Sequence, residues 1–232
     1  MAEFEKEVSM LDKFRNDYCV HFYGACFIPG KICMVTEFAQ YGSMQDLMEK
    51  QSDNLPTKMK IKFMLDSAKG LQYLHRNDVL HRDIKPDNFL VLSVTDNVPV
   101  NAKLTDFGAS RNVNMLMTNM TFTKGVGTPK YMAPEMLAKE KYKKPTDVYS
   151  FAVTMLEIMI WGDAYPKALY KFPWDIANLV TNGGRTKLYE QIMNEGIKDI
   201  IKDTWCQNPL ERLVIDSVVK RLEEEYEKEI NA

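Results

Sequence analysis

The chain has 232 residues, of which 45% are hydrophobic and 27% are charged, and its net charge at pH 7 is −2. This composition is that of an ordinary globular protein with enough apolar side chains for a sizeable core. The near-neutral charge gives no electrostatic reason to expect nucleic acid or an anionic membrane surface as a partner.

Cysteine usage and the first residues favour a cytoplasmic location. The four cysteines form no close CxxC pair, which indicates reduced thiols rather than a disulfide framework. Residues 1–11 are acidic and lack the apolar core of a secretory signal. The most apolar run, residues 151–162, is too short to span a bilayer and contains Glu157. We therefore expect a buried helix there and no membrane segment.

The beginning of the chain predicts a helix followed by a hairpin. Apolar side chains recur at helical spacing through residues 3–15, which predicts an amphipathic helix. Two apolar runs then flank the pair Pro29-Gly30, a turn signal that predicts a β-hairpin. A polar, Gly-containing loop leads from the hairpin to a short helix at residues 46–50.

The middle of the chain predicts one long helix and two short strands. Pro56 stands at a first helical position, and the apolar side chains after it share one helical face as far as His75. The apolar runs at residues 89–92 and 102–107 predict two strands joined by a loop. Residues 109–130 have no steady period and predict a long loop, which in compact domains is usually functional or disordered.

The remainder of the chain predicts helices. From residue 134 onward the pattern is helical with a break at residues 182–184, and residues 147–160 are apolar nearly all round, as a central buried helix requires. The order is therefore a helix, a hairpin and then mostly helices around one small strand pair. This order predicts an α+β fold with a mainly helical second part.

The segment HRDIKPDN, residues 81–88, carries side chains suited to phosphoryl transfer. The tripeptide HRD alone is better explained by a solvated ion pair. Between a long helix and a strand, however, Asp83 could accept a hydroxyl proton, Lys85 could hold a phosphate and Asn88 could offer a hard oxygen to Mg²⁺. The next strand ends at Asp106, a second hard-oxygen ligand, and strand pairing would bring Asn88 and Asp106 together around the metal.

Several independent motifs follow one another in a recognisable order: HRDIKPDN (81–88), DFG (106–108), GTPKYMAPE (127–135), TDVYSFAV (146–153) and NPLER (208–212). On these motifs the chain resembles the eukaryotic protein kinase family over nearly all of its length. The HRDxKxxN and GTPxYMAPE forms resemble Ser/Thr kinases, and FYGAC, TEFAQYGSM and TDVYSFAV resemble the tyrosine-kinase-like group among them. Dual specificity stays open. Small-molecule phosphotransferases are disfavoured because they lack a segment like GTPKYMAPE.

The resemblance implies four catalytic residues, with ATP and Mg²⁺ as cofactors and a protein as the substrate. Asp83 is implied to be the base that orients the substrate hydroxyl, and Lys85 to contact the transferred phosphoryl group. Asn88 and Asp106 are implied to be the Mg²⁺ ligands. The resemblance implies nothing about the oligomeric state.

The resemblance also implies an adenine site. Thr36 stands where the family has its gatekeeper, Glu37 and Ala39 fall on the hinge whose backbone groups bind adenine, and Leu90 falls beneath the adenine ring. Thr36 and Leu90 would also be unremarkable core residues in any fold, so that reading stays open for both.

Other matches concern the architecture and its regulation. Glu135 and Arg212 resemble a buried ion pair that ties the substrate-binding segment to the helical lobe, and Asp147 resembles the helix residue that holds the HRD backbone. Three side chains resemble the packed column that aligns the lobes: Leu11, His81 and Phe107. Three threonines of the long loop are candidates for a phosphate that pairs with Arg82: Thr118, Thr121 and Thr123. A solvated loop hydroxyl is an equally good reading of each.

Two features of the family have no match in the 232 residues. A Gly-rich loop and a lysine on the third strand should precede the first helix, in which Glu7 resembles the partner of that lysine, and neither is present. The resemblance therefore implies one kinase domain over residues 1–232 that is incomplete at its N-terminus. Residues 1–38 would be the remnant of the small lobe and residues 39–232 the helical lobe.

Two functions from different classes follow. The first is an ATP-dependent Ser/Thr protein kinase that transfers the γ-phosphoryl group, with the activity of this chain alone left open. The second is a pseudokinase or interaction scaffold without catalysis. All four implied catalytic side chains are present, which favours the kinase.

Overall fold

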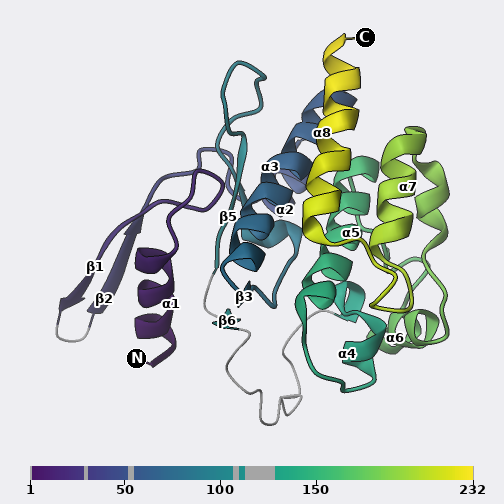
Figure 1. The fold of residues 1–232 in the computed structure, drawn as a ribbon, viewed down its shortest axis with the longest axis horizontal. Coiled ribbons are helices and arrows are strands. Elements are labelled where there is room, and N and C mark those ends of the chain that lie inside the picture. Colours follow the sequence, from purple (N-terminus) through teal and green to yellow (C-terminus); the bar gives the residue numbers. More distant parts are fainter. Residues whose placement is uncertain (1, 29–30, 52–54, 107–109, 113–128, 232) are drawn as a thin grey trace.

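The computed structural model describes residues 2–28, 31–51, 55–106, 110–112 and 129–231. Its element order is one helix, a hairpin and then mainly helices (Figure 1), which confirms the predicted α+β fold with a helix-and-hairpin part and a mainly helical part. Phe107 and the three candidate threonines lie outside the described residues, and the side chain of Glu7 is likewise not described.

The helices are α1 (Ala2–Lys13), α2 (Met44–Lys50), α3 (Thr57–Arg76), α4 (Pro134–Leu137), α5 (Lys144–Ile160), α6 (Pro173–Thr181), α7 (Glu195–Thr204) and α8 (Ile215–Asn231). The strands are β1 (Phe22–Ile28), β2 (Lys31–Thr36), β3 (Val79–Leu80), β4 (Phe89–Val91), β5 (Ala102–Leu104) and β6 (Arg111–Asn112). The described residues also form the 3₁₀ segments η1 (Pro86–Asn88), η2 (Pro129–Tyr131) and η3 (Lys187–Gln191).

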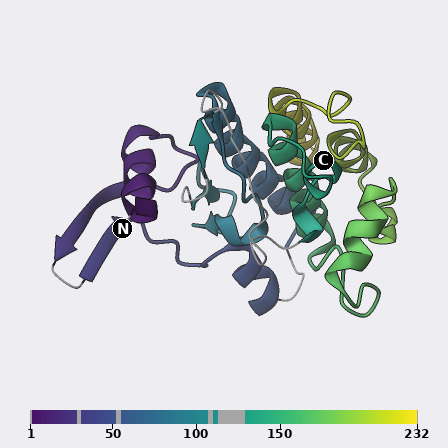
Figure 2. The same ribbon diagram turned by 90° about the horizontal axis from the view of Figure 1, so that it is seen from below.

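The first helix and the hairpin lie together at one side of the molecule (Figures 1 and 2). β1 and β2 pair antiparallel across the predicted turn. Ala25 and Met34 are partners in this pair and pack against the core, whereas Tyr23 and Val35 are 67% and 53% exposed. The hairpin thus has one covered face and one solvent-facing face, as antiparallel sheets often do.

Two long helices form the centre of the helical part. α3 is buried over most of its length and lies against α5, α8 and β5. α5 is buried at every position from Thr146 to Ile158, which confirms the buried central helix predicted from its apolar sequence. Its C-cap is Trp161, whose φ of 53° is left-handed and whose indole N–H donates to the Gln51 carbonyl at 3.0 Å.

β4 and β5 pair antiparallel as predicted, with Phe89 opposite Leu104. The chain that leaves α1 adds to the other edge of β5, because Val20 N–H donates to the Leu104 carbonyl and Leu104 N–H donates to the Tyr18 carbonyl, each at 2.9 Å. Gly70 of α3 permits this approach, since a Cβ at that position would lie 2.7 Å from the Tyr18 oxygen. The helix-and-hairpin part is thereby joined to the helical part.

Several details differ from the sequence-based expectations. β3 and β6 form a further antiparallel pair, with Leu80 opposite Arg111, where only a loop was expected. Pro56 is the N-cap of α3 rather than its first residue. The chain is not helical between α4 and α5, between α5 and α6 and between α7 and α8, although a helical pattern with one break at residues 182–184 was expected from residue 134 onward. Two-residue strands and single caps carry too few residues to show a period.

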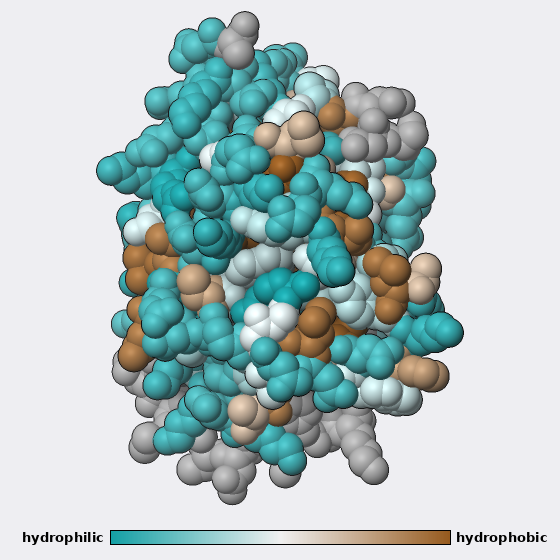
Figure 3. All heavy atoms as spheres, turned by 90° about the vertical axis from the view of Figure 1, so that its right-hand side faces the viewer, coloured by the Kyte–Doolittle hydropathy of each residue, from teal (hydrophilic) through white to brown (hydrophobic). Residues whose placement is uncertain are grey.

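The side of the molecule away from the hairpin is mainly hydrophilic. Figure 3 shows apolar side chains in small groups separated by hydrophilic ones, as is usual for a solvent-facing surface. Among the helices of the described ranges, none has both the length and the apolar character needed to cross a bilayer.

Candidate active site

Asp147 of α5 fixes the turn that follows β3. Its buried carboxylate accepts the backbone N–H groups of His81 at 2.9 Å and of Arg82 at 2.8 Å. His75 Nε2 lies 2.9 Å from the same carboxylate, and the Tyr142 hydroxyl donates to it at 2.6 Å. Burial alone would raise the pKa of Asp147, but the hydrogen bonds outweigh burial and the pKa lies below its usual value. An ionised carboxylate therefore anchors the turn.

Arg82 has a strained backbone at this turn. Its φ of 76° lies in the left-handed region, which a residue with a Cβ adopts at a cost of about 1–3 kcal/mol. The conformation persists because neighbouring N–H groups must both reach Asp147. Burial lowers the pKa of the Arg82 guanidinium, which lies over the Tyr142 ring at 5.8 Å from its centroid.

His81 ties the turn to the strand that precedes Asp106. Its buried Nδ1 accepts the N–H of Asp83 at 3.3 Å, so the ring proton is on Nε2, which donates to the Thr105 carbonyl at 2.9 Å. Thr105 N–H in turn donates to the Asn88 carbonyl at 2.9 Å. Both backbone groups of Thr105 are therefore bound to the segment 81–88, and this brings Asp106 beside Asn88.

The carboxylate of Asp83 is anchored through one oxygen. Lys85 Nζ lies 2.7 Å from Oδ2, and Asn88 Nδ2 donates to Oδ2 at 3.1 Å and to the Asp83 carbonyl at 2.6 Å. Oδ1 receives no hydrogen bond from the residues that the structure describes. The side chains of Asp83 and Lys85 are 30% and 28% exposed. A held carboxylate with one accessible oxygen can accept a proton from a bound hydroxyl.

Asn88 and Asp106 form a donor set suited to Mg²⁺. Both amide hydrogens of Asn88 are used on Asp83, which leaves Oδ1 as an acceptor. Asp106 supplies a partly exposed carboxylate at a φ of 62°. No group of three or more His, Cys, Asp or Glu side chains that could hold a metal ion occurs in the described part of the chain. Mg²⁺ usually keeps several waters and binds substrate phosphates, so two oxygen donors from the protein could suffice to hold it.

Lys103 brings together two of the four predicted adenine-site residues, Glu37 and Leu90. Glu37 follows β2, and its carboxylate accepts hydrogen bonds from Lys103 Nζ at 2.8 and 2.9 Å. Lys103 of β5 is the register partner of Leu90 in β4. The linker between β2 and α2, which begins at Glu37, is thus held over the β4–β5 pair. No sequence pattern predicted this ion pair, because its partners are 66 positions apart.

Thr36 and Ala39 lie on either side of Glu37 and have local partners. Thr36 ends β2 opposite Phe22, and the Ala39 carbonyl accepts the N–H of Gly42 at 3.1 Å. Both residues are partly buried. No hydrogen bond joins either of them to the segment 81–88 in the part of the chain that the structure describes.

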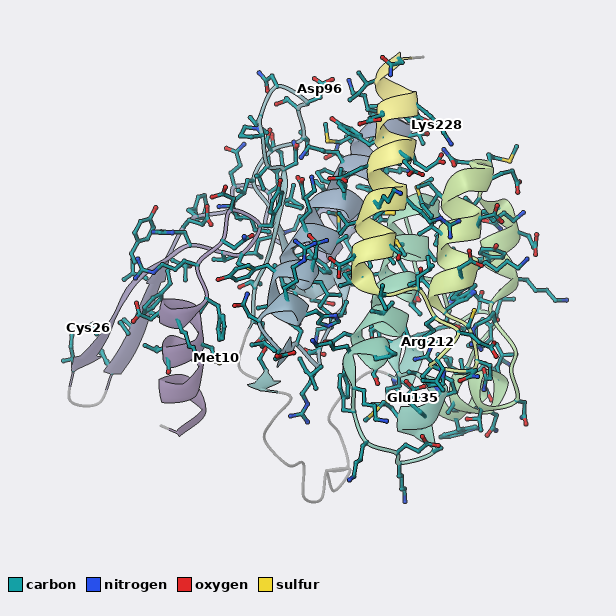
Figure 4. All side chains as sticks on the ribbon, in the orientation of Figure 1. Met10, Cys26, Asp96, Glu135, Arg212 and Lys228 are labelled. Atoms are coloured by element: carbon teal, nitrogen blue, oxygen red, sulfur yellow. The ribbon has the colours of Figure 1, made fainter. Side chains whose placement is uncertain are left out.

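Glu135 and Arg212 form a buried, bidentate ion pair with N–O distances of 2.6 and 2.7 Å (Figure 4). The side chain of Arg212 is fully buried and that of Glu135 is 7% exposed. Thr146 donates to the Glu135 carboxylate at 3.1 Å, and Arg212 also donates to the carbonyls of Cys206 and Pro145. This pair joins α4 to the loop before α8.

A further buried carboxylate, that of Glu157, was not assigned to the site from the sequence. Glu157 of α5 is 1% exposed and accepts the Tyr131 hydroxyl at 2.6 Å, Lys130 Nζ at 2.9 Å and the Ala164 N–H at 3.0 Å. Burial raises the pKa of Glu157, and the charge of Lys130 opposes that shift. The one signal available was a glutamate inside the apolar run 151–162. Glu157 thereby ties Lys130 and Tyr131 to α5.

Replacing Tyr131 with phenylalanine is expected to reduce the free energy of unfolding by about 1–3 kcal/mol. The change leaves a buried Glu157 oxygen without its donor. Urea unfolding of the two proteins measures the difference. Tyr189→Phe is the control, because its hydroxyl donates to a partly exposed carbonyl of Lys198 that water can reach. Equal losses in both variants would contradict a special role for Tyr131.

Comparisons with known proteins find that the chain is similar to protein kinases. Residues 1–222 match the family described as protein tyrosine and serine/threonine kinase. The chain is 33% identical to the probable serine/threonine-protein kinase gdt9 of Dictyostelium discoideum over 94% of its own length and 16% of that protein. It is 33% identical to the dual specificity protein kinase shkB of the same organism, over 91% of the chain and 32% of that protein. It is 30% identical to the serine/threonine-protein kinase STY17 of Arabidopsis thaliana, over 96% of the chain and 37% of that protein. The chain thus spans less than two fifths of each relative.

Proposed function

The chain belongs to the family of protein tyrosine and serine/threonine kinases, and from that membership we propose that it transfers the γ-phosphoryl group of ATP to Ser or Thr hydroxyls of protein substrates. The observation that carries the proposal is the common anchoring of three backbone positions. One hydrogen-bond network through His81 and Thr105 holds the Asp83 N–H, the Asn88 carbonyl and the residue that precedes Asp106. Phosphoryl transfer depends mainly on such positioning and on electrostatics.

Each side chain has a distinct part in the proposed reaction. Asp83 orients the substrate hydroxyl and accepts its proton through Oδ1, while Oδ2 is held by Lys85 and Asn88. Lys85 contacts the transferred phosphoryl group, so that its charge offsets the negative charge there. Asn88 and Asp106 hold Mg²⁺, which when bound neutralises charge on the phosphates.

The same proposal assigns the adenine of ATP to the junction between the hairpin and β4. Thr36, Glu37 and Ala39 would line one side of that junction and Leu90 the other. The Glu37–Lys103 ion pair supports this assignment, because it holds the linker at a fixed place over β4 and β5. Residues 1–38 and 39–232 would then be the small and the helical lobes of one kinase domain.

A second candidate function is partner binding without catalysis. The observation that favours it is a group of exposed apolar and aromatic side chains on the hairpin: Tyr23, Ile28 and Val35.

Transfer of label from γ-³²P-ATP to myelin basic protein or casein tests the proposal. We expect Mg²⁺-dependent label on Ser or Thr when the full-length protein that carries these residues is used, and no label in the presence of EDTA. A folded full-length protein that binds Mg²⁺ and nucleotide but transfers no phosphate would overturn the kinase and favour the binding function.

Replacing Asp106 with asparagine is expected to weaken binding of Mg²⁺-ADP at least about tenfold, or about 1.4 kcal/mol. The variant removes a charged metal ligand and keeps the size of the side chain. Isothermal titration of the full-length protein measures the affinity. The matched control is Asp96→Asn. Asp96 lies in the loop between β4 and β5, and its exposed carboxylate pairs with Lys58 of α3. Unchanged Mg²⁺-ADP affinity in Asp106→Asn would exclude the assigned ligand role.

A further inference from the structure

The β1–β2 hairpin places two cysteines directly opposite each other. Cys26 of β1 is the register partner of Cys33 of β2. Opposite residues of an antiparallel pair project from the same face, with Cα atoms about 4.5 or about 5.5 Å apart. A disulfide bond joins Cα atoms about 4.4–6.8 Å apart. The strand register therefore already meets the main geometric requirement for a bond between these two residues.

The face that carries the two cysteines is open to solvent. Cys26 and Cys33 are both free thiols and both exposed, and Figure 4 shows Cys26 near the turn end of the hairpin. Val35, two residues from Cys33, is also exposed, at 53%. The opposite face carries Ala25 and Met34, which pack against the core. A small oxidant can reach both thiols without any change in the fold.

The other two cysteines have different surroundings. Cys19 is 1% exposed, and burial raises the pKa of its thiol to about 12, which disfavours the reactive thiolate. Cys206 is partly buried beyond α7, and its sulfur lies 3.5 Å from the carbonyls of Lys202 and Asp203. These two cysteines serve as internal references for the hairpin pair.

We propose that Cys26 and Cys33 form a dithiol site that low-molecular-weight disulfides such as glutathione disulfide convert to a cross-strand disulfide. The thiolate of one cysteine attacks a sulfur of the oxidant, forms a mixed disulfide and releases one glutathione thiolate. The second cysteine attacks the protein sulfur of the mixed disulfide and releases the second glutathione. The protein gives up two electrons and two protons, and one glutathione disulfide becomes two glutathione molecules.

The bond would act on a weak part of the fold. A two-stranded hairpin is marginally stable by itself, and this one is a separate two-stranded sheet. A crosslink between Cys26 and Cys33 fixes the register of β1 against β2. Because β2 ends immediately before Glu37, the bond also restrains the backbone that leads into the linker. We expect slower amide exchange in β1 and β2 of the oxidised protein than of the reduced protein.

Thiol counting and peptide mapping of the full chain test the site. The reduced chain is incubated with glutathione disulfide, then unfolded in the presence of an alkylating agent and digested without reductant. We expect two of the four thiols to be lost, with one peptide pair that contains Cys26 joined to Cys33, in a monomer. Cys19 and Cys206 should be recovered alkylated. Tris(2-carboxyethyl)phosphine should restore all four thiols.

Two variants separate the proposed bond from other oxidation. Cys206→Ser should form the Cys26–Cys33 bond as the unaltered chain does. Cys33→Ser should stop at a mixed disulfide of Cys26 with glutathione, because the resolving thiol is missing. Glutathione on both cysteines of the unaltered chain, or crosslinks between two chains in place of the internal bond, would overturn the proposal. The readout does not depend on kinase activity.

Discussion

Replacing Asp83 with asparagine is expected to lower kcat for phosphoryl transfer by about 10²- to 10⁴-fold, the usual contribution of a positioned acid–base group. Asparagine has nearly the same size and keeps an oxygen for Lys85 and for the Asn88 amide. It cannot accept the proton of the substrate hydroxyl. We therefore expect the KM for ATP to stay close to that of the unaltered protein, since the loss falls on the transition state.

Steady-state kinetics of the full-length protein with a Ser/Thr substrate measure this effect. Asp87→Asn is the matched control, because Asp87 lies in the same segment and its side chain is exposed. Thermal unfolding should show that both variants are folded. A similar loss of kcat in both variants, or full activity of Asp83→Asn, would remove Asp83 from the assigned role.

The elements that bury many apolar side chains were predictable from the sequence. α5 was expected because its residues are apolar nearly all round, and it is buried from Thr146 to Ile158. The β1–β2 hairpin was expected from two apolar runs that flank Pro29-Gly30. These elements form mainly because they bury apolar side chains against a core. The positions of those apolar side chains can be read directly from the sequence.

The residues of the candidate site could be predicted from their motifs. The hydrogen bonds and ion pairs that hold those residues in place could not. The residues 81–88 and Asp106 could be named because their chemistry and order are distinctive. The His81–Thr105 hydrogen bond and the Glu37–Lys103 ion pair could not, since both depend on tertiary placement. The same holds for β3 and β6, whose two residues each are too short to show alternation.

Replacing Arg212 with leucine is expected to reduce the free energy of unfolding by about 3–5 kcal/mol. The substitution leaves the Glu135 carboxylate in a buried site without its bidentate partner. It also leaves the carbonyls of Cys206 and Pro145 without the donors that Arg212 supplies. Urea unfolding of the full chain at constant pH measures the difference.

The effect should come from burial rather than from the loss of an ion pair as such. Arg76 and Asp216 form a pair with side chains 64% and 50% exposed, so Arg76→Leu should cost less than about 1 kcal/mol. A double variant with leucine at Glu135 and Arg212 should be more stable than Arg212→Leu alone, because no unpaired charge remains buried. If Arg212→Leu cost no more than Arg76→Leu, the Glu135–Arg212 pair would not hold α4 against the loop before α8.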